Sequence, residues 1–295
     1  MTPPLRVATR GSALARWQAE RVLQRLGVEG ELVIVTTTGD RDAHSPISAL
    51  GGQGVFVKEV QTAVLDGSAD VSVHSAKDLP STTPPGLILA CVPERADPRD
   101  ALVGRALDDL PTGARVATGS VRRRAQLAHL RPDLTFAELR GNVPTRVARA
   151  GEHDAVVIAL AALERLELVD ERVHPVEPAQ LLPQVAQGAL AVECRADDEE
   201  TGALLHTIEE PAARRAVDAE RAFLAQLGGG CDVPVGALAT IDGDSVALAV
   251  MLASLDGRIA LRATTRSVDP AEAGRDAARL LLDTYGGRAV LEGAV

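Results

Sequence analysis

Short apolar runs alternate with segments of helical periodicity along the first two thirds of the chain. The apolar runs that predict buried strands lie at residues 5–9, 31–37, 70–74, 87–92, 134–139, 154–160 and 189–194. Helical periodicity follows the first run, where Ser12 is a candidate N-cap for a helix to about residue 26, and returns at residues 55–65. Such alternation of strand and helix is typical of an α/β fold with largely parallel sheets.

The C-terminal part has a different pattern. Apolar strands are predicted at residues 235–241, 245–253 and 258–266, and helices at residues 212–227 and 271–285. The strands are separated by Asp-Gly turns, which join antiparallel neighbours. This pattern predicts a small α+β domain with a three-stranded antiparallel sheet.

The predicted elements divide the chain into three domains. A charged, proline-containing segment at residues 93–99 interrupts the α/β pattern and indicates a linker. We expect two α/β domains that form a cleft, one from residues 1–93 with 189–206 and the other from residues 94–188. The third domain, residues 211–295, is the α+β domain.

The two α/β domains open with similar sequences. Val7-Ala8-Thr9-Arg10-Gly11-Ser12 and Val116-Ala117-Thr118-Gly119-Ser120 each combine a strand, a turn of small residues and a helix start. The free N–H groups at such a helix start favour an anion, and a nearby arginine strengthens the site. For either copy alone, a capped helix start with an exposed arginine remains an alternative interpretation.

Composition narrows the possible functions. The 295 residues are 46% hydrophobic, which is enough for a substantial core, and the net charge of −10 with few aromatic residues argues against nucleic acid as a partner. No apolar span reaches membrane length, and residues 1–6 lack a secretory signal, so we expect a cytoplasmic protein. The cysteines and histidines show no metal-ligand spacing, and we expect no metal.

A glycine-rich segment at residues 228–236 carries Cys231. Glycines allow a bulky group to approach the backbone closely, so this loop cysteine is a candidate covalent anchor, with a free thiol as the alternative. Cys91 and Cys194 lie in apolar strands instead, and we interpret both as core residues.

Charged side chains follow several predicted strands. Asp78 is a candidate acid–base group next to Lys77 in the turn after residues 70–74, although a Lys-Asp pair on the surface is an alternative. Ligands of open α/β sheets bind at the carboxyl ends of strands, where Arg140, Arg146 and Arg165 are expected. Solvated surface arginines are the alternative for these three.

Seven segments in order along residues 5–240 carry a resemblance to the porphobilinogen deaminase family, also called hydroxymethylbilane synthases. They are VATRGSALARWQ, VHSAKDLP, DPRDAL, TGSVRRRAQL, LRGNVPTR, QGALAVECR and GGGCDVPVG. The resemblance implies two similar periplasmic-binding-protein-like α/β domains and a C-terminal α+β domain. It also implies a transferase of haem biosynthesis that joins four porphobilinogen molecules into linear hydroxymethylbilane and releases ammonia.

The resemblance further assigns roles to residues. It makes Asp78 the catalytic group and Cys231 the thioether anchor of a dipyrromethane cofactor. The remaining cofactor-binding residues that it implies are Lys77, Ser75, Thr118, Ser120, Arg122 and Arg123. The substrate-binding residues that it implies are Arg10, Ser12, Arg140, Arg146, Arg165, Phe56 and Gln187. Arginines suit this substrate because each pyrrole carries two carboxylates.

The chain departs from the family at the glycine-rich loop before residue 55. Ala49 and Gln53 stand where many members have lysines, while Phe56 matches. Two other functions remain open on the residues alone. One is a non-catalytic two-domain protein that binds a small anion, and the other is a cysteine hydrolase using Cys231. We expect a monomer that binds neither nucleic acid nor membrane.

Overall fold

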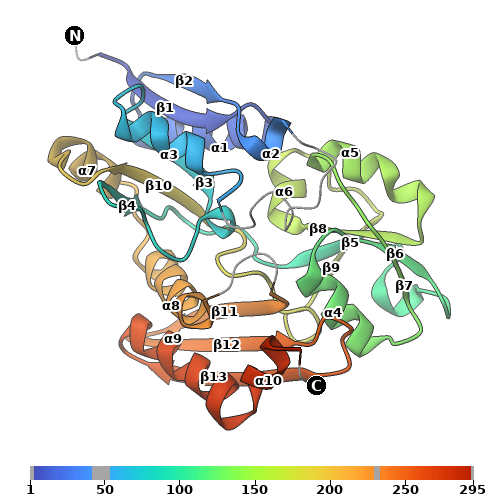
Figure 1. Ribbon diagram of the computed structural model, residues 1–295. Helices are drawn as coiled ribbons and strands as arrows, with labels where there is room; N and C mark the ends of the chain where they lie inside the picture. The colour runs from blue at the N-terminus through green and yellow to red at the C-terminus, as the bar shows by residue number, and fades with distance from the viewer. Residues whose placement is uncertain (1–2, 42–53, 229–232, 294–295) are drawn as a thin grey trace. The chain divides into compact units, whose positions relative to one another are not determined.

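The computed structural model describes residues 3–41, 54–228 and 233–293, and its chain forms two compact units (Figure 1). Unit 1 comprises the chain to Ala96 together with Ala189–Arg214, and unit 2 comprises Asp97–Gly188 together with the chain from Arg215. The chain therefore passes between the units at three points.

Unit 1 is built on a five-stranded sheet of order β2-β1-β3-β10-β4. Its strands are β1 (Leu5–Arg10), β2 (Gly30–Val35), β3 (Val71–Ser75), β4 (Leu87–Cys91) and β10 (Leu190–Arg195). Its helices are α1 (Ala13–Leu26), α2 (Thr38–Arg41), α3 (Lys58–Leu65), the 3₁₀ turn η2 (Ala76–Asp78) and α7 (Glu199–His206). Strand β10 runs antiparallel to both neighbours, and the other four strands share one direction.

Helices cover both faces of this sheet. Ala19 and Val22 of α1 pack on one face with Val73. Val60 and Val64 of α3 pack on the opposite face. Because successive strand residues point to opposite faces, a central strand such as β3 is buried on both sides, which explains its continuous apolar appearance in sequence.

Unit 2 repeats this arrangement in its first part, with sheet order β7-β6-β8-β5-β9. The strands are β5 (Asp100–Gly104), β6 (Arg115–Ala117), β7 (Thr135–Ala137), β8 (Ala155–Ala159) and β9 (Val173–Val176). The helices are α4 (Val121–Leu130), α5 (Val143–Ala148) and α6 (Leu160–Arg165), with 3₁₀ turns η3 (Leu107–Asp109) and η4 (Arg149–Glu152). Strand β5 is antiparallel to both neighbours. In each sheet the reversed strand is thus the first one after the chain enters from the other unit.

The C-terminal part contains an antiparallel sheet of order β11-β12-β13. Its elements are α8 (Pro211–Leu227), β11 (Val235–Asp242), β12 (Ser245–Ala253), β13 (Ala260–Ser267), α9 (Pro270–Arg279), the π-helical η5 (Leu280–Thr284) and α10 (Gly287–Leu291). Met251 and Ala253 of this sheet pack with Ala125 of α4.

The structure confirms the predicted fold class, with two α/β sheets and a three-stranded antiparallel sheet. Two details differ from the sequence interpretation. The prediction of largely parallel sheets missed the antiparallel β5 and β10, and the C-terminal helix expected at residues 271–285 widens into a π turn after Arg279. Strands β5 and β9 were not predicted. The division into three domains stays a prediction.

Candidate active site

Unit 1 contains a small cavity at the carboxyl ends of β1 and β3. Five side chains that the resemblance assigned to the site line it, namely Arg10, Ser12, Phe56, Ser75 and Asp78. The remaining lining residues are Leu14, Ala15, Gln18, Val57, Val73 and His74. The structure therefore brings together predicted residues that are far apart in sequence, from Arg10 to Asp78. This position agrees with the rule that ligands bind at strand carboxyl ends.

Asp78 reaches the cavity because β3 ends in a tight 3₁₀ turn, η2. The N–H of Ala76 donates to the carbonyl of Ala189, the residue before β10, at 3.0 Å, and the N–H of Leu79 closes the turn onto the carbonyl of Ala76. Before the turn, Ser75 Oγ lies 2.8 Å from Gln18 Nε2 of α1. Asp78 itself is half-buried. The turn thus holds a carboxylate at the cavity with its backbone fixed on two sides.

Arg10, the last residue of β1, is held by two partners. Its Nε donates to Asp40 Oδ2 at 3.2 Å, its Nη2 contacts the other oxygen of the same carboxylate, and its Cζ lies 4.1 Å from the centre of the Phe56 ring. Burial would raise the pKa of Asp40, but hydrogen bonds from Arg10 and Thr37 lower it below its usual value. Asp40 therefore stays ionised and fixes the guanidinium beside the cavity.

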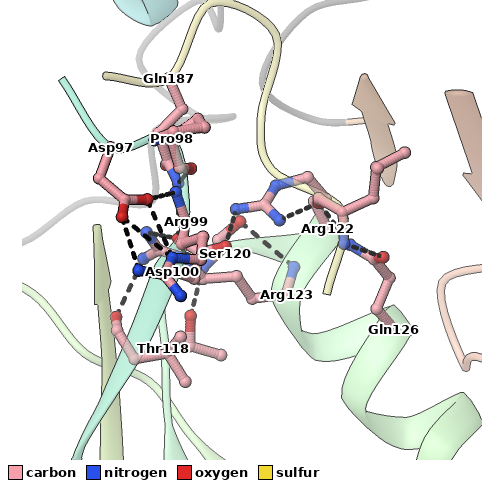
Figure 2. Close-up of polar contacts among 12 residues, drawn as sticks. Asp97, Pro98, Arg99, Asp100, Thr118, Ser120, Arg122, Arg123, Gln126 and Gln187 are labelled. Atoms are coloured by element: carbon pink, nitrogen blue, oxygen red, sulfur yellow. Dashed lines mark hydrogen bonds and ion pairs between the residues drawn. The ribbon is translucent and has the colours of Figure 1, made fainter. Parts of the chain in front are cut away.

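Unit 2 contains a second polar site, a buried cluster around Asp100 (Figure 2). Arg122 Nη2 lies 2.7 Å from Asp100 Oδ2, and Arg123 donates to Oδ1 through Nη2 at 2.6 Å and Nε at 3.0 Å. Gln187 Nε2 also donates to Oδ1, at 2.9 Å. Asp100 and Gln187 are fully buried, and the two arginines are 3% and 6% exposed. We call these four residues the Asp100 cluster.

The charges of the Asp100 cluster do not cancel. Burial alone would raise the pKa of Asp100, but the charges and hydrogen bonds of Arg122 and Arg123 lower it far below its usual value. One carboxylate therefore faces two guanidiniums, and the cluster keeps a net charge of about +1. Arg122 Nε is buried and has no hydrogen-bond acceptor among the described residues. A site with spare buried positive charge favours an anionic ligand.

The helix start predicted at Ser120 is present beside the Asp100 cluster. Ser120 caps α4 by accepting from the N–H of Arg123 at 3.4 Å, and Thr118 Oγ1 accepts from the N–H of Ser120 at 3.2 Å. In unit 1, Ser12 caps α1 in the same way, by accepting from the N–H of Ala15. The repeated strand, turn and helix start seen in sequence is therefore real in structure, and both hydroxyls serve as caps.

The other three predicted arginines of unit 2 lie outside the Asp100 cluster. Arg140 Nε pairs with Glu138 at 3.0 Å, Arg146 Nε donates to the carbonyl of Gly141 at 2.7 Å, and Arg165 Nη2 donates to the carbonyl of Gly188 at 2.6 Å. Burial lowers the pKa of Arg165 to about 10.

Several predicted residues have other outcomes. Cys231, Ala49 and Gln53 lie outside the described residues. Lys77 lies in η2 between Ala76 and Asp78 but is not among the cavity-lining residues. The core interpretation of Cys91 and Cys194 is confirmed, because both are fully buried free thiols.

Sequence reasoning missed three side chains of these sites. Gln18 and His74 line the cavity in unit 1, and Asp100 organises the cluster in unit 2. His74 and Asp100 lie within motifs that carry the resemblance, VHSAKDLP and DPRDAL, but only the three-dimensional contacts distinguish them from neighbouring polar residues. Gln18 is likewise the last residue of the motif VATRGSALARWQ.

The described residues offer neither a metal centre nor a membrane-spanning helix. They contain no group of three or more acidic, histidine or cysteine side chains suited to hold a metal ion. Within the same ranges, no helix combines the length and apolar character needed to cross a bilayer.

The fold and the two polar sites define an α/β protein with binding chemistry for anionic ligands. The chain matches the family described as "Porphobilinogen deaminase, dipyromethane cofactor binding domain" over residues 5–203. It matches "Porphobilinogen deaminase, C-terminal domain" over residues 214–283. The chain belongs to the porphobilinogen deaminase family.

Two relatives are similar in sequence to this chain along nearly its full length. A porphobilinogen deaminase of Roseiflexus castenholzii is 48% identical, covering 99% of this chain and 100% of the relative. One of Moorella thermoacetica is 45% identical, covering 98% and 96%. Among solved structures, the periplasmic sulfonate-binding protein SsuA of Methylobacillus flagellatus matches 74% of this chain and 67% of its own at 14% identity, with a TM-score of 0.36.

Proposed function

We propose that this protein is a porphobilinogen deaminase that joins four porphobilinogen molecules head to tail and releases hydroxymethylbilane and ammonia. The observation that carries the proposal is the identity of 48% to a porphobilinogen deaminase along 99% of the chain. The cavity at Asp78 and the buried cations of the Asp100 cluster support it, because they offer the chemistry that this reaction needs.

The described residues fit a dipyrromethane cofactor. This group carries four carboxylates, and the Asp100 cluster has spare positive charge and an unpaired buried donor, Arg122 Nε. We infer that Cys231 holds the cofactor through a thioether. Its further binding residues are then Ser75, Lys77, Thr118, Ser120, Arg122 and Arg123. When bound, the cofactor supplies the free pyrrole α-carbon to which the first substrate is added.

Asp78 stabilises the cation that forms when porphobilinogen loses ammonia. Departure of ammonia leaves positive charge on the aminomethyl carbon and the pyrrole nitrogen, and a fixed carboxylate in a half-buried cavity stabilises that charge more strongly than water does. The backbone of η2 is held by the hydrogen bond from Ala76 to Ala189, so the carboxylate needs little reorganisation during the reaction.

Arginines hold the carboxylates of the substrate and of the growing chain. We infer this role for Arg10, Arg140, Arg146 and Arg165, with Ser12, Phe56 and Gln187 completing the substrate contacts. Guanidiniums bind carboxylates through two parallel hydrogen bonds, which fixes orientation as well as position. Arg10 is already oriented by Asp40 and Phe56, so it meets a substrate carboxylate in a set position.

We also propose that the protein works as a cytoplasmic monomer with no nucleic-acid or membrane partner. Its net charge of −10 disfavours nucleic acid, and its proposed substrate is a small soluble molecule.

Turnover of porphobilinogen tests the proposal. Purified protein is expected to release four molecules of ammonia for each hydroxymethylbilane formed. Asp78→Asn keeps the size of the side chain but removes its charge, and we expect it to lower kcat at least ~100-fold, the usual effect of removing one stabilising charge. A protein that binds porphobilinogen without releasing ammonia would instead be the small-anion binder considered from sequence.

A further inference from the structure

A group of polar side chains is buried within unit 1, next to the cavity. Glu193 of β10 is fully buried, and its two carboxylate oxygens accept from Gln61 Nε2 of α3 at 2.9 and 3.0 Å. His74 of β3 is 5% exposed, and its Nε2 lies 3.2 Å from Glu193 Oε2. That contact is close but not aligned for a hydrogen bond, so His74 Nε2 has no aligned partner among the described residues.

The sheet register explains how these groups meet. Strands β3 and β10 pair so that Glu193 lies opposite Ser72 and Ala191 lies opposite His74. Residues two apart on a strand share a face, so Ser72, His74 and Glu193 all point to the side covered by α3. The rest of that layer is apolar, with Val60, Val64 and Ala8 at its centre.

Burial of Glu193 and His74 lowers the free energy of unfolding unless their charges are compensated. A carboxylate removed from water loses several kcal/mol of solvation, and an amide donor alone returns only part of it. The imidazole of His74, with Nε2 3.2 Å from Glu193 Oε2, is the basic side chain that the structure places beside this carboxylate. An apolar side chain at Glu193 and His74 would pack the same layer without this cost. Stability of the sheet therefore does not explain the pair.

His74 also lines the cavity that contains Asp78. Among the described residues that line the cavity, Asp78 carries the one carboxylate and His74 the one imidazole, and an imidazole is the usual proton acceptor of enzymes. We propose that His74, oriented by Glu193, is the proton-accepting group of the condensation, with Glu193 as its positioning residue. This inference rests on the proposed function.

In the proposed condensation step, Asp78 and His74 each have one task. The C–N bond of the aminomethyl group breaks, ammonia leaves, and a C–C bond forms between the aminomethyl carbon and the α-carbon of the preceding ring. The α-carbon must then lose its proton, and the C–H electron pair restores the aromatic pyrrole. Neutral His74 takes that proton and passes it to ammonia, which departs as ammonium, while Asp78 stays an anion throughout.

We infer the tautomer from the position of His74 Nε2, which lies 3.2 Å from Glu193 Oε2. When Nε2 of an imidazole carries the hydrogen and faces a carboxylate, Nδ1 is the nitrogen that can accept a proton. A carboxylate orients a histidine base in this way. The charged groups around the ring are Glu193 on β10 behind it and Asp78 and Arg10 at the cavity, while Gln61 on α3 is neutral. Glu193 and Asp78 favour the protonated ring that forms during the step, and Arg10 opposes it.

The test compares His74→Gln and Glu193→Gln with His129→Gln, a control in unit 2 whose imidazole contacts the carbonyl of Gly257. Turnover is measured with porphobilinogen that carries hydrogen or deuterium at the free α-carbon, together with intact mass and thermal unfolding. For His74→Gln we expect kcat to fall at least ~100-fold, as for loss of a general base, with KM within threefold. Its kcat should also show a primary deuterium isotope effect above 2, because proton removal becomes rate-limiting.

Glu193→Gln should show the same isotope effect with a smaller loss of kcat, and the control should resemble the unchanged protein. The proposal is wrong if His74→Gln keeps kcat within threefold, or loses it without an isotope effect. If His74→Gln does not fold, the isotope effect of Glu193→Gln decides in the same way. Absence of turnover in the unchanged protein would instead contradict the proposed function itself.

Discussion

At the scale of single residues, Asp100 shows how a charge acquires its role from its contacts. It accepts from Arg122, Arg123 and Gln187 while fully buried. Asp100 lies two residues before Leu102, in a motif that contains a second aspartate, Asp97. Asp97 pairs with Arg99 and is more exposed than Asp100. The sequence predicted both arginines as ligand-binding residues, but it could not predict their counter-ion, because pairing between α4 and β5 depends on the fold.

Asp100→Asn should therefore destabilise the protein far more than Asp97→Asn. Removing the carboxylate leaves two guanidiniums buried without compensation, which costs about 3–5 kcal/mol. Loss of the partly exposed Asp97–Arg99 pair costs about 1 kcal/mol. Urea unfolding at pH 7 measures both. Equal losses for the two variants would contradict the role assigned to Asp100.

The pKa of Asp100 also predicts how the stability lost in Asp100→Asn depends on pH. The folded-state pKa of Asp100 is lowered, so its stabilising contribution is present above the unfolded-state pKa of about 4 and is lost only as the pH falls toward the lower folded value. The stability difference between the unchanged protein and Asp100→Asn should accordingly stay constant from pH 7 to pH 5. A difference that already declines over this interval would contradict the lowered pKa.

The three cysteines should react differently with iodoacetamide. Burial raises the pKa of Cys91 to about 12 and that of Cys194 to about 11, so neither is a thiolate at pH 8 and neither is accessible in the folded protein. We expect no labelling of the native protein. After unfolding we expect two added groups, since a thioether at Cys231 cannot be alkylated under these conditions. Three added groups, measured by intact mass, would contradict the thioether.

At the scale of elements, apolar runs predicted most strands but not their order or direction. The buried β3 and β8 stand out in sequence because both of their faces are covered. Strand β9 (Val173–Val176) contains a histidine and a proline and is only partly buried, so no apolar run marks it. Strands β5 and β10 each follow a point where the chain passes from one unit to the other, and each runs antiparallel to its neighbours. The local pattern of apolar residues does not encode such a crossing.

The turn between β12 and β13 provides a test of packing between elements of unit 2. Gly257 has a φ of +76°, and a Cβ there would lie 2.5 Å from the carbonyl of Ala125 and 2.8 Å from Ala128 Cβ on α4. Gly243, in the turn between β11 and β12, has a φ of +57° with nothing within 4 Å of its Cβ position. The two glycines therefore share backbone strain but differ in contact.

Gly257→Ala should cost more stability than Gly243→Ala. The backbone strain common to both costs about 1–2 kcal/mol, and overpacking against α4 adds about 1–3 kcal/mol for Gly257 alone. Urea unfolding gives both values. If the two variants lose the same stability, the β12–β13 turn does not pack on α4 as described.

At the scale of the whole molecule, the chain combines two related α/β sheets, a C-terminal antiparallel sheet and two polar sites, one in each unit. The motifs identified the family and five of the eleven residues that line the cavity in unit 1. They could not identify His74 or Gln18 as cavity residues, because that placement depends on β1, β3 and α1 meeting at one edge.

The most direct measurement is the intact mass of the denatured protein compared with that of Cys231→Ser. The account predicts that the unchanged protein is heavier than its sequence by one dipyrrole unit, and that Cys231→Ser has its sequence mass and forms no hydroxymethylbilane. An unchanged protein at its sequence mass that still forms hydroxymethylbilane, or a Cys231→Ser variant with ordinary turnover, would contradict the central claim.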